Sequence, residues 1–457
     1  VKGLPYSINV IQEILDEIDS ITINEQYESI KASVKENIEL DKINIVFAIE
    51  DTEKLTVEKI NIYGNNITNE NVIRNQLLLD EGDPYNEILS NRSINNIKSL
   101  NFFKSVKKNV IEGENPQTRI INIELEEKPT GEITAGAGFG TSGGTLIFGV
   151  KENNYLGKGL SVNSNLTINS ESVKGILSVR NPNFKDSNKS VFVSLEATET
   201  DRLTTSGYQM NKTGFNLGTK FEYFDDVFVG FSTSSFIEKI ETNSTASTRQ
   251  KSQEGNYFDS FLGLSIDHDK RNQKFQTDKG FRSIYDLKLP LVSDTNTITN
   301  FYSYKYFTDL YEDNISTFSI YLKSVNSITN DDVKLSERAF VPSSRLRGFE
   351  VGKVGPKDGE DFVGGNFVTT MNISSTLPFL FENSQNTDFI MFLDVANIWG
   401  VDYDSSINDS SKIRSAIGIG VDYFTPIGPL NISLSEVLSK NDTDVTQGFR
   451  FNLGTTF

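Results

Sequence analysis

Residues 160–169 read LSVNSNLTIN, and this stretch decides the fold because its apolar and polar side chains alternate along the chain. Leu160, Val162 and Leu166 fall on one face of an extended strand, and Asn163 and Asn165 fall on the other. A period of two predicts a β-strand with one apolar and one polar face. Such a strand belongs either to a membrane barrel, between lipid and a polar lumen, or to a soluble sandwich.

The same alternation continues to the end of the chain and favours the barrel. Residues 215–223 and 281–291 repeat it, and long charged side chains lie on the polar face. The last nine residues, 449–457, read FRFNLGTTF, so the chain ends in an apolar strand. An open edge of this kind is sticky, whereas barrel closure pairs the last strand with the first. At about 20 residues per strand and turn, residues 130–457 predict a mainly β protein, a 16-stranded antiparallel transmembrane β-barrel.

The composition excludes most catalytic chemistry. Among 457 residues there is no Cys and one His, which excludes thiol nucleophiles, disulfides and multi-His metal sites. His268 could serve a Ser-His-Asp arrangement, but its neighbours Asp267 and Asp269 project to the opposite face of a strand. The net charge of −18 argues against nucleic acid as a partner. We therefore expect no enzyme activity, no cofactor and no metal.

The first 129 residues repeat one α/β unit. Gly-x-Pro-Tyr occurs at residues 3–6 and again at 82–85. The complete copy, residues 54–129, predicts a strand, a helix over 69–79, a second helix capped by Asn86, and two strands. Residues 1–53 are expected to be a partial copy of the unit. The chain begins at Val1 without a signal segment, so we expect it to be a processed or cut product. The strand edge of such a unit suits an extended peptide, and a plain spacer is the alternative.

Several ordered motifs resemble the BamA family of outer-membrane β-barrel assembly factors. FVPSSRLRGFE at 340–350 is similar to the Arg-Gly-Phe tip of that family's inward-folded loop. DKRN at 269–272, followed by TDKG at 277–280, is similar to its strand-turn signature, and GEITAGAGFGTSGG at 131–144 is similar to its first strand. The N-terminal units resemble POTRA domains, so the resemblance covers essentially the whole chain.

The resemblance implies a barrel over 130–457 with an inward-folded loop around 338–366, in a bacterial outer membrane, and POTRA domains in the periplasm. Family members fold and insert other β-barrel proteins. The expected partners are therefore unfolded outer-membrane barrel proteins, periplasmic lipoprotein subunits and outer-membrane lipid, with Glu81 as a lipoprotein contact. A secretion transporter or a translocation-and-assembly subunit of the same superfamily is the alternative. The resemblance also implies further POTRA domains that this chain lacks.

The resemblance also assigns roles to single residues. The loop tip contains Arg347, Gly348 and Phe349, and Asp394 is the implied partner of Arg347 in a lumen clamp. Asn372 stands where the family has a second acidic residue. A lateral seam between the first and last strands is expected to contain Gly136, Gly138, Gly140, Phe449, Phe451, Gly454 and Phe457. Glycine weakens a strand, although these glycines could also relieve crowding around aromatic side chains.

Overall fold

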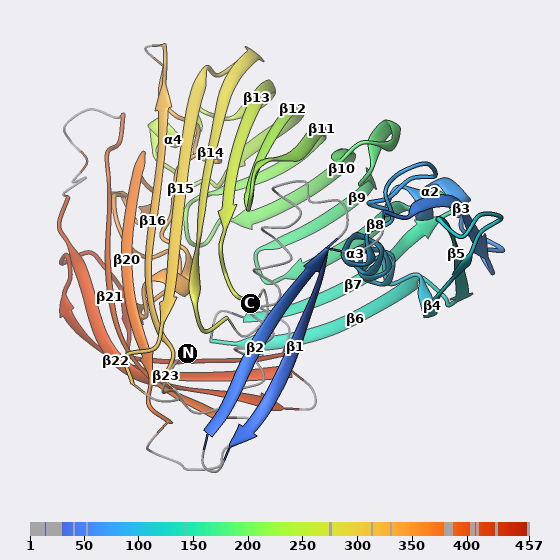
Figure 1. Ribbon diagram of the computed structural model, residues 1–457. Helices are drawn as coiled ribbons and strands as arrows, with labels where there is room; N and C mark the ends of the chain where they lie inside the picture. The colour runs from blue at the N-terminus through green and yellow to red at the C-terminus, as the bar shows by residue number, and fades with distance from the viewer. Residues whose placement is uncertain are drawn as a thin grey trace. The chain divides into compact units, whose positions relative to one another are not determined.

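The computed structural model describes residues 14, 30–39, 42–51, 54–141, 143–273, 277–311, 314–329, 331–378, 387–402, 407, 411–425 and 428–454. The chain forms two compact units (Figure 1). Unit 1 comprises residues 1–131 and 153–160, and unit 2 comprises residues 132–152 and 161–457. Among the described residues, no helix is long and apolar enough to cross a membrane.

Unit 1 contains a three-stranded sheet with two helices. β3 (Thr56–Tyr63) runs parallel to the central strand β5 (Thr118–Glu127), and β4 (Phe103–Glu112) runs antiparallel to it. Parallel neighbours need a crossover connection. Here α2 (Glu70–Arg74) and α3 (Glu87–Ser99) lie in the chain between β3 and β4. The order strand, helix, helix, strand, strand agrees with the prediction.

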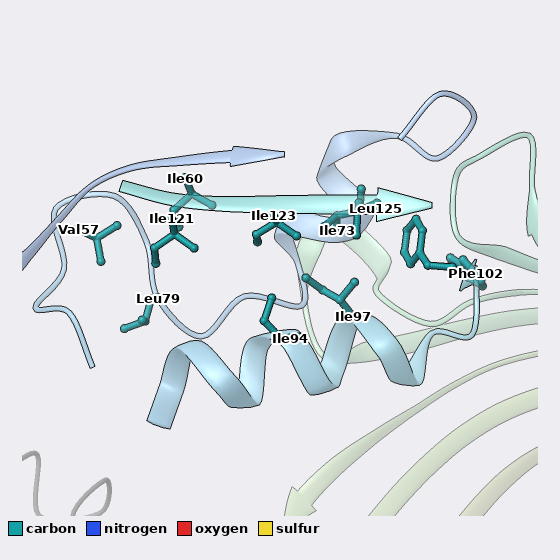
Figure 2. Close-up of a cluster of buried hydrophobic side chains, with 11 residues drawn as sticks. Val57, Ile60, Ile73, Leu79, Ile94, Ile97, Phe102, Ile121, Ile123 and Leu125 are labelled. Atoms are coloured by element: carbon teal, nitrogen blue, oxygen red, sulfur yellow. The ribbon is translucent and has the colours of Figure 1, made fainter. Parts of the chain in front are cut away.

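The core of unit 1 lies between α3 and the sheet (Figure 2). Ile94 and Ile97 are three residues apart on α3 and share one face, as i and i+3 positions do. They pack in one buried cluster with Ile121 and Ile123 of β5. The cluster also contains Val57, Ile60, Ile73, Leu79, Phe102, Phe103 and Leu125.

One helix prediction is confirmed and the other is wrong in length. The Asn86 side chain accepts hydrogen bonds from the backbone N–H groups of Ile88 and Leu89, at 2.9 and 3.1 Å, and so caps α3. The helix predicted over 69–79 ends at Arg74. The chain then leaves the helical path, and Leu79 reaches the core from a non-helical segment.

The turn around Gly157 also belongs to unit 1. Asn154 Nδ2 donates to Thr68 Oγ1 at 2.8 Å, and a Cβ on Gly157, at φ +70°, would lie 1.9 Å from the Ile67 carbonyl oxygen. Glu127 accepts from the backbone N–H groups of Thr68 and Ile67 at 2.7 and 2.9 Å. Partial burial opposes ionisation, but these hydrogen bonds outweigh it and hold the pKa of Glu127 below its ordinary value.

A hairpin lies nearer the N-terminus. β1 (Ile30–Glu39) pairs antiparallel with β2 (Lys42–Asp51) along its whole length. The rest of the predicted partial unit over 1–53 lies almost entirely outside the described residues.

Unit 2 is a closed antiparallel barrel, and within the described residues it has the sixteen strands that the length of residues 130–457 predicts (Figure 1). They are β6 (Gly131–Gly140), β7 (Gly143–Tyr155), β8 (Leu160–Asn169), β9 (Ser172–Asn181), β10 (Lys189–Arg202), β11 (Tyr208–Phe224), β12 (Val227–Thr242), β13 (Gly255–Asp269), β14 (Gly280–Ser293), β15 (Thr297–Thr308), β16 (Ser316–Ser327), β20 (Phe367–Thr376), β21 (Thr387–Trp399), β22 (Arg414–Thr425), β23 (Gly428–Ser439) and β25 (Phe449–Gly454).

The barrel wall has an apolar outer face, and on strands such as β10 the inner face is polar. On β10, Val193 and Leu195 point outward and are 45% and 54% exposed, while Ser194 and Glu196 point inward between them. Further exposed apolar side chains lie around the wall, among them Phe148, Phe215, Phe231, Leu262, Met391 and Ile419. A continuous apolar outer surface is the face that a membrane barrel presents to lipid.

The connection between β16 and β20, called the inner loop here, packs against the barrel wall. It contains the short pair β18 (Lys357–Asp358) and β19 (Asp361–Phe362). Its Leu346 and Phe349 are buried in one cluster with Val368, Ala396 and Ile398 of the wall. The inner loop therefore has a hydrophobic anchor as well as the polar anchors described below.

Candidate functional site

Within the described residues, which end at Gly454, the closing pair of the barrel is short. β25 pairs with β6 through Asn452, Leu453 and Gly454, which lie opposite Gly140, Phe139 and Gly138. By contrast, β10 pairs with β11 along its whole length. Among the described residues, pairing with β25 is confined to the last three positions of β6. The predicted seam residue Phe457 lies outside the described residues.

Two glycines permit the close approach of these strands. A Cβ on Gly140 would lie 2.4 Å from the Phe451 carbonyl oxygen. Gly454 has φ +99°, and a Cβ there would lie 2.3 Å from the Ala137 carbonyl oxygen. A larger residue at either position would push the strands apart.

Aromatic side chains cover the outer side of the seam. Phe139 and Phe451 meet edge to face across it with ring centroids 5.9 Å apart, and Phe449 lies 6.2 Å from Phe451. Phe139 and Phe449 remain half exposed, at 55% and 50%. Such pairs add a modest attraction to the backbone pairing of the seam.

The structure brings Arg347 and Asp394 together. The Arg347 guanidinium donates from Nε and Nη2 to the two Asp394 carboxylate oxygens, at 2.7 and 2.8 Å, and its backbone N–H donates at 3.0 Å. Asp394 is fully buried, and the guanidinium carbon lies 3.3 Å from the centre of the Phe392 ring. Bidentate pairing fixes orientation as well as charge.

Asn372 completes this site. Its side-chain amide donates to Asp394 Oδ1 at 2.9 Å and to the backbone carbonyl of Arg345 at 2.7 Å. One carboxylate therefore faces one guanidinium, with a neutral donor beside them. An acidic residue at position 372 would instead put two carboxylates beside one another in a buried site.

The tip of the inner loop is also bonded to the segment that leads into β25. β17 (Gly348–Phe349) pairs antiparallel with β24 (Thr446–Gln447). The backbone N–H of Glu350 donates to the Val445 carbonyl at 2.9 Å. The predicted tip residues Gly348 and Phe349 thus meet the closing hairpin, while Arg347 faces β21.

A buried ion-pair cluster around Lys334 holds the first limb of the inner loop, which is the part that follows β16. Lys334 is 2% exposed and donates to Glu238 on β12 at 2.7 Å and to Asp259 on β13. Burial alone would lower the pKa of Lys334, but the carboxylates of Glu337, Glu238 and Asp259 outweigh it and raise that pKa. Sequence reasoning missed this cluster. Strand alternation could have placed Glu238 and Asp259 inside the barrel, but no local pattern marks their loop partner.

The remaining predicted residues, His268 and Glu81, take part in packing and in backbone hydrogen bonding. Asp267 accepts from Arg282 and Lys220 on the lumen side, whereas His268 packs edge to face on Phe281, 4.9 Å between ring centroids. His268 and Asp267 are therefore not positioned as a catalytic pair. In unit 1, Glu81 accepts from the backbone N–H of Ile60 at 2.9 Å.

Comparison with known proteins agrees with this architecture. Residues 154–457 match the model of the Omp85 superfamily domain, and residues 55–128 match the POTRA model, described as surface antigen variable number repeat. The chain belongs to the Omp85 superfamily. As an Omp85 protein with a POTRA domain, it lies in the outer membrane, with the POTRA domain in the periplasm.

This Omp85 chain is 24% identical over 435 residues to the outer membrane protein assembly factor BamA of Neorickettsia risticii. The aligned region covers 91% of this chain and 57% of that protein. The chain thus spans less than two thirds of that relative. The crystal structure of BamA from Haemophilus ducreyi lacking POTRA domains 1–3 has a TM-score of 0.80 at 20% identity, covering 100% of this chain and 95% of that one. CdiB from Acinetobacter baumannii has a TM-score of 0.58 at 15% identity, covering 96% and 82%.

Proposed function

We propose that this chain folds and inserts β-barrel proteins into the outer membrane through the seam between β6 and β25. The short pairing of these two strands within the described residues is the observation that carries the proposal. The similarity to BamA over most of the chain supports it. The proposal divides the chain into a partial POTRA domain at 1–53, a complete one at 54–129 and the barrel at 130–457.

The physical argument concerns strand edges in lipid. Unpaired backbone N–H and C=O groups cost several kcal/mol each in the hydrocarbon core, so a barrel inserting strand by strand needs an edge to pair with. Opening the seam would separate the three residue pairs that join β6 and β25 in the described part of the chain, and it would expose the edges of both strands. An incoming strand could then pair by β-augmentation.

The POTRA domain offers a second place for an extended client. The outer edge of β3 is already occupied, because Ile60 bonds to the side chains of Glu81 and Arg74 and Val57 bonds to the 82–83 segment. Within residues 54–131, β4 pairs with β5 on one side, and no backbone hydrogen bond is found at its other edge. We therefore assign the peptide edge to β4. A lipoprotein that binds Glu81 would have to compete with Ile60 and Arg74.

A folding assay tests the proposal. A urea-unfolded outer-membrane barrel protein is diluted into liposomes that contain the full chain, and folding is followed by the gel shift of the closed barrel. Faster folding than in empty liposomes is expected. An unchanged rate would overturn the proposal.

A secretion transporter is the second candidate, and the similarity to CdiB in fold keeps it open. A transporter should show large and stable single-channel conductance in planar bilayers and affect one client. An insertase should show small, irregular conductance, and its depletion should lower many unrelated outer-membrane barrels together. The non-enzymatic assignment predicts that His268→Ala changes neither result.

A further inference from the structure

Arg450 lies on β25, two residues before the first residue that pairs with β6. Its side chain points into the barrel and is 7% exposed. Nη1 donates to the backbone carbonyl of Ser343, and Nη2 donates to the backbone carbonyl of Phe349, both at 2.6 Å. The closing strand is therefore bonded through one side chain to two points of the inner loop.

The surroundings of this guanidinium are unusual for a buried cation. Among the described residues it has no carboxylate within ion-pair distance, and its Nε has no hydrogen-bond partner. The nearby charges that act on it are Arg347, which repels it, and Asp394, which attracts it. A buried charge without a counter-charge is costly, so its two strong hydrogen bonds to the inner loop carry most of its compensation.

The two carbonyls that Arg450 binds bracket the loop tip. Between Ser343 and Phe349 lies Arg347, which is clamped to Asp394 on β21. The same short segment is thus attached to the fixed wall on one side and to the closing strand on the other. If β25 moves away from β6, either the bonds of Arg450 break or the loop tip moves with the strand.

We infer that Arg450 is a positioning residue that couples the inner loop to the seam. While the loop tip is clamped to Asp394, Arg450 holds β25 in register with β6. Release of the tip loosens the seam, and opening of the seam loosens the tip, because such coupling is reciprocal. A role for this coupling in client insertion rests on the proposed function, but the coupling itself does not.

The test uses a reporter for the seam. The chain has no native Cys, so Phe139→Cys with Leu453→Cys introduces one thiol pair directly across the seam. The rate of disulfide formation under mild oxidant reports how often β6 and β25 are paired. Trypsin cleavage after residues 345 and 347, read by mass spectrometry, reports release of the loop tip. Both are measured on the full chain in liposomes, without a client.

Four substitutions are compared in this reporter background, and one of them, Arg347→Lys, weakens the clamp to Asp394. Arg450→Gln removes the charge and both strong bonds. Arg450→Lys keeps the charge but can reach only one carbonyl at a time. Arg180→Gln is the matched control, because Arg180 lies on β9 and stacks on Phe192, away from the inner loop. The heat-dependent gel shift of a closed barrel confirms that each variant is folded.

Arg450→Gln should slow disulfide formation and speed loop cleavage, each by about fivefold, while Arg450→Lys gives intermediate values and Arg180→Gln matches the parent. Arg347→Lys should shift both readouts in the same direction as Arg450→Gln. The variant that carries both substitutions should differ little from Arg450→Gln alone in either readout. A change in only one readout, or in neither, would overturn the coupling. Failure of the folding assay with the coupling intact would overturn the proposed function alone.

Discussion

Asn372 and Arg347 bind the same buried carboxylate from two sides. The amide of Asn372 and the guanidinium of Arg347 both donate to Asp394 Oδ1, at 2.9 and 2.8 Å. Asn372 also holds the carbonyl of Arg345 in the inner loop. A neutral residue at this position therefore fastens the loop without a second negative charge.

Asn372→Asp should weaken the clamp by about 1–3 kcal/mol. The new carboxylate would face Asp394 and would lose the hydrogen bond to the Arg345 carbonyl. Faster trypsin cleavage of the inner loop measures the effect. Asn163→Asp, the same change on the polar face of β8, is the control. Equal cleavage of Asn372→Asp and the parent would contradict the prediction.

Arg347→Ala should have a larger effect, about 3–5 kcal/mol, because it leaves Asp394 buried without its cation. The expected results are loop release and slower folding of client proteins in liposomes. Arg347→Lys should fall between Ala and the parent, since one ammonium cannot reproduce the bidentate pair. Wild-type protease resistance in Arg347→Ala would show that the apolar packing of Phe349 and Leu346 is sufficient alone.

Lys334→Met should release the first limb of the inner loop at neutral pH, at a cost of about 3–5 kcal/mol. Without the ammonium, the carboxylates of Glu238 and Asp259 face one another in a buried site. Lys357→Met, at a more exposed position of the same loop, is the control. Protease mapping measures both variants, and wild-type resistance of the inner loop in Lys334→Met would contradict the prediction.

Glu127 should make the stability of unit 1 depend on pH. Its pKa in the folded unit lies below the ordinary 4.5, so its stabilising contribution is present above that value and is lost as the pH falls through the folded pKa. Glu127→Gln should lower the melting temperature of unit 1 at pH 7, and the difference from the parent should shrink below about pH 4.5. Calorimetry of the full chain in detergent measures this, with Glu124→Gln as control. A difference that stays constant with pH would contradict the assignment.

The fold could be predicted further than the site. Alternation predicts strands because it reports which side chains face lipid, and the length of residues 130–457, at about 20 residues per strand and turn, correctly predicts sixteen of them. The helix over 69–79 was too long because the position of Leu79 depends on the core of unit 1 rather than on helical periodicity. Lys334 and Arg450 could not be found from sequence patterns, since their partners are distant residues or backbone carbonyls, which leave no local pattern.

The most direct test of the central claim is the client-folding rate with the seam locked. The Phe139→Cys/Leu453→Cys protein is oxidised, and folding of a client barrel in liposomes is measured before and after reduction in the same sample. The Leu195→Cys/Phe215→Cys protein, whose thiols lie opposite one another on β10 and β11, is the matched control. We expect the locked seam to abolish the acceleration and reduction to restore it, while the control stays active throughout. Full acceleration by the locked protein would contradict the account.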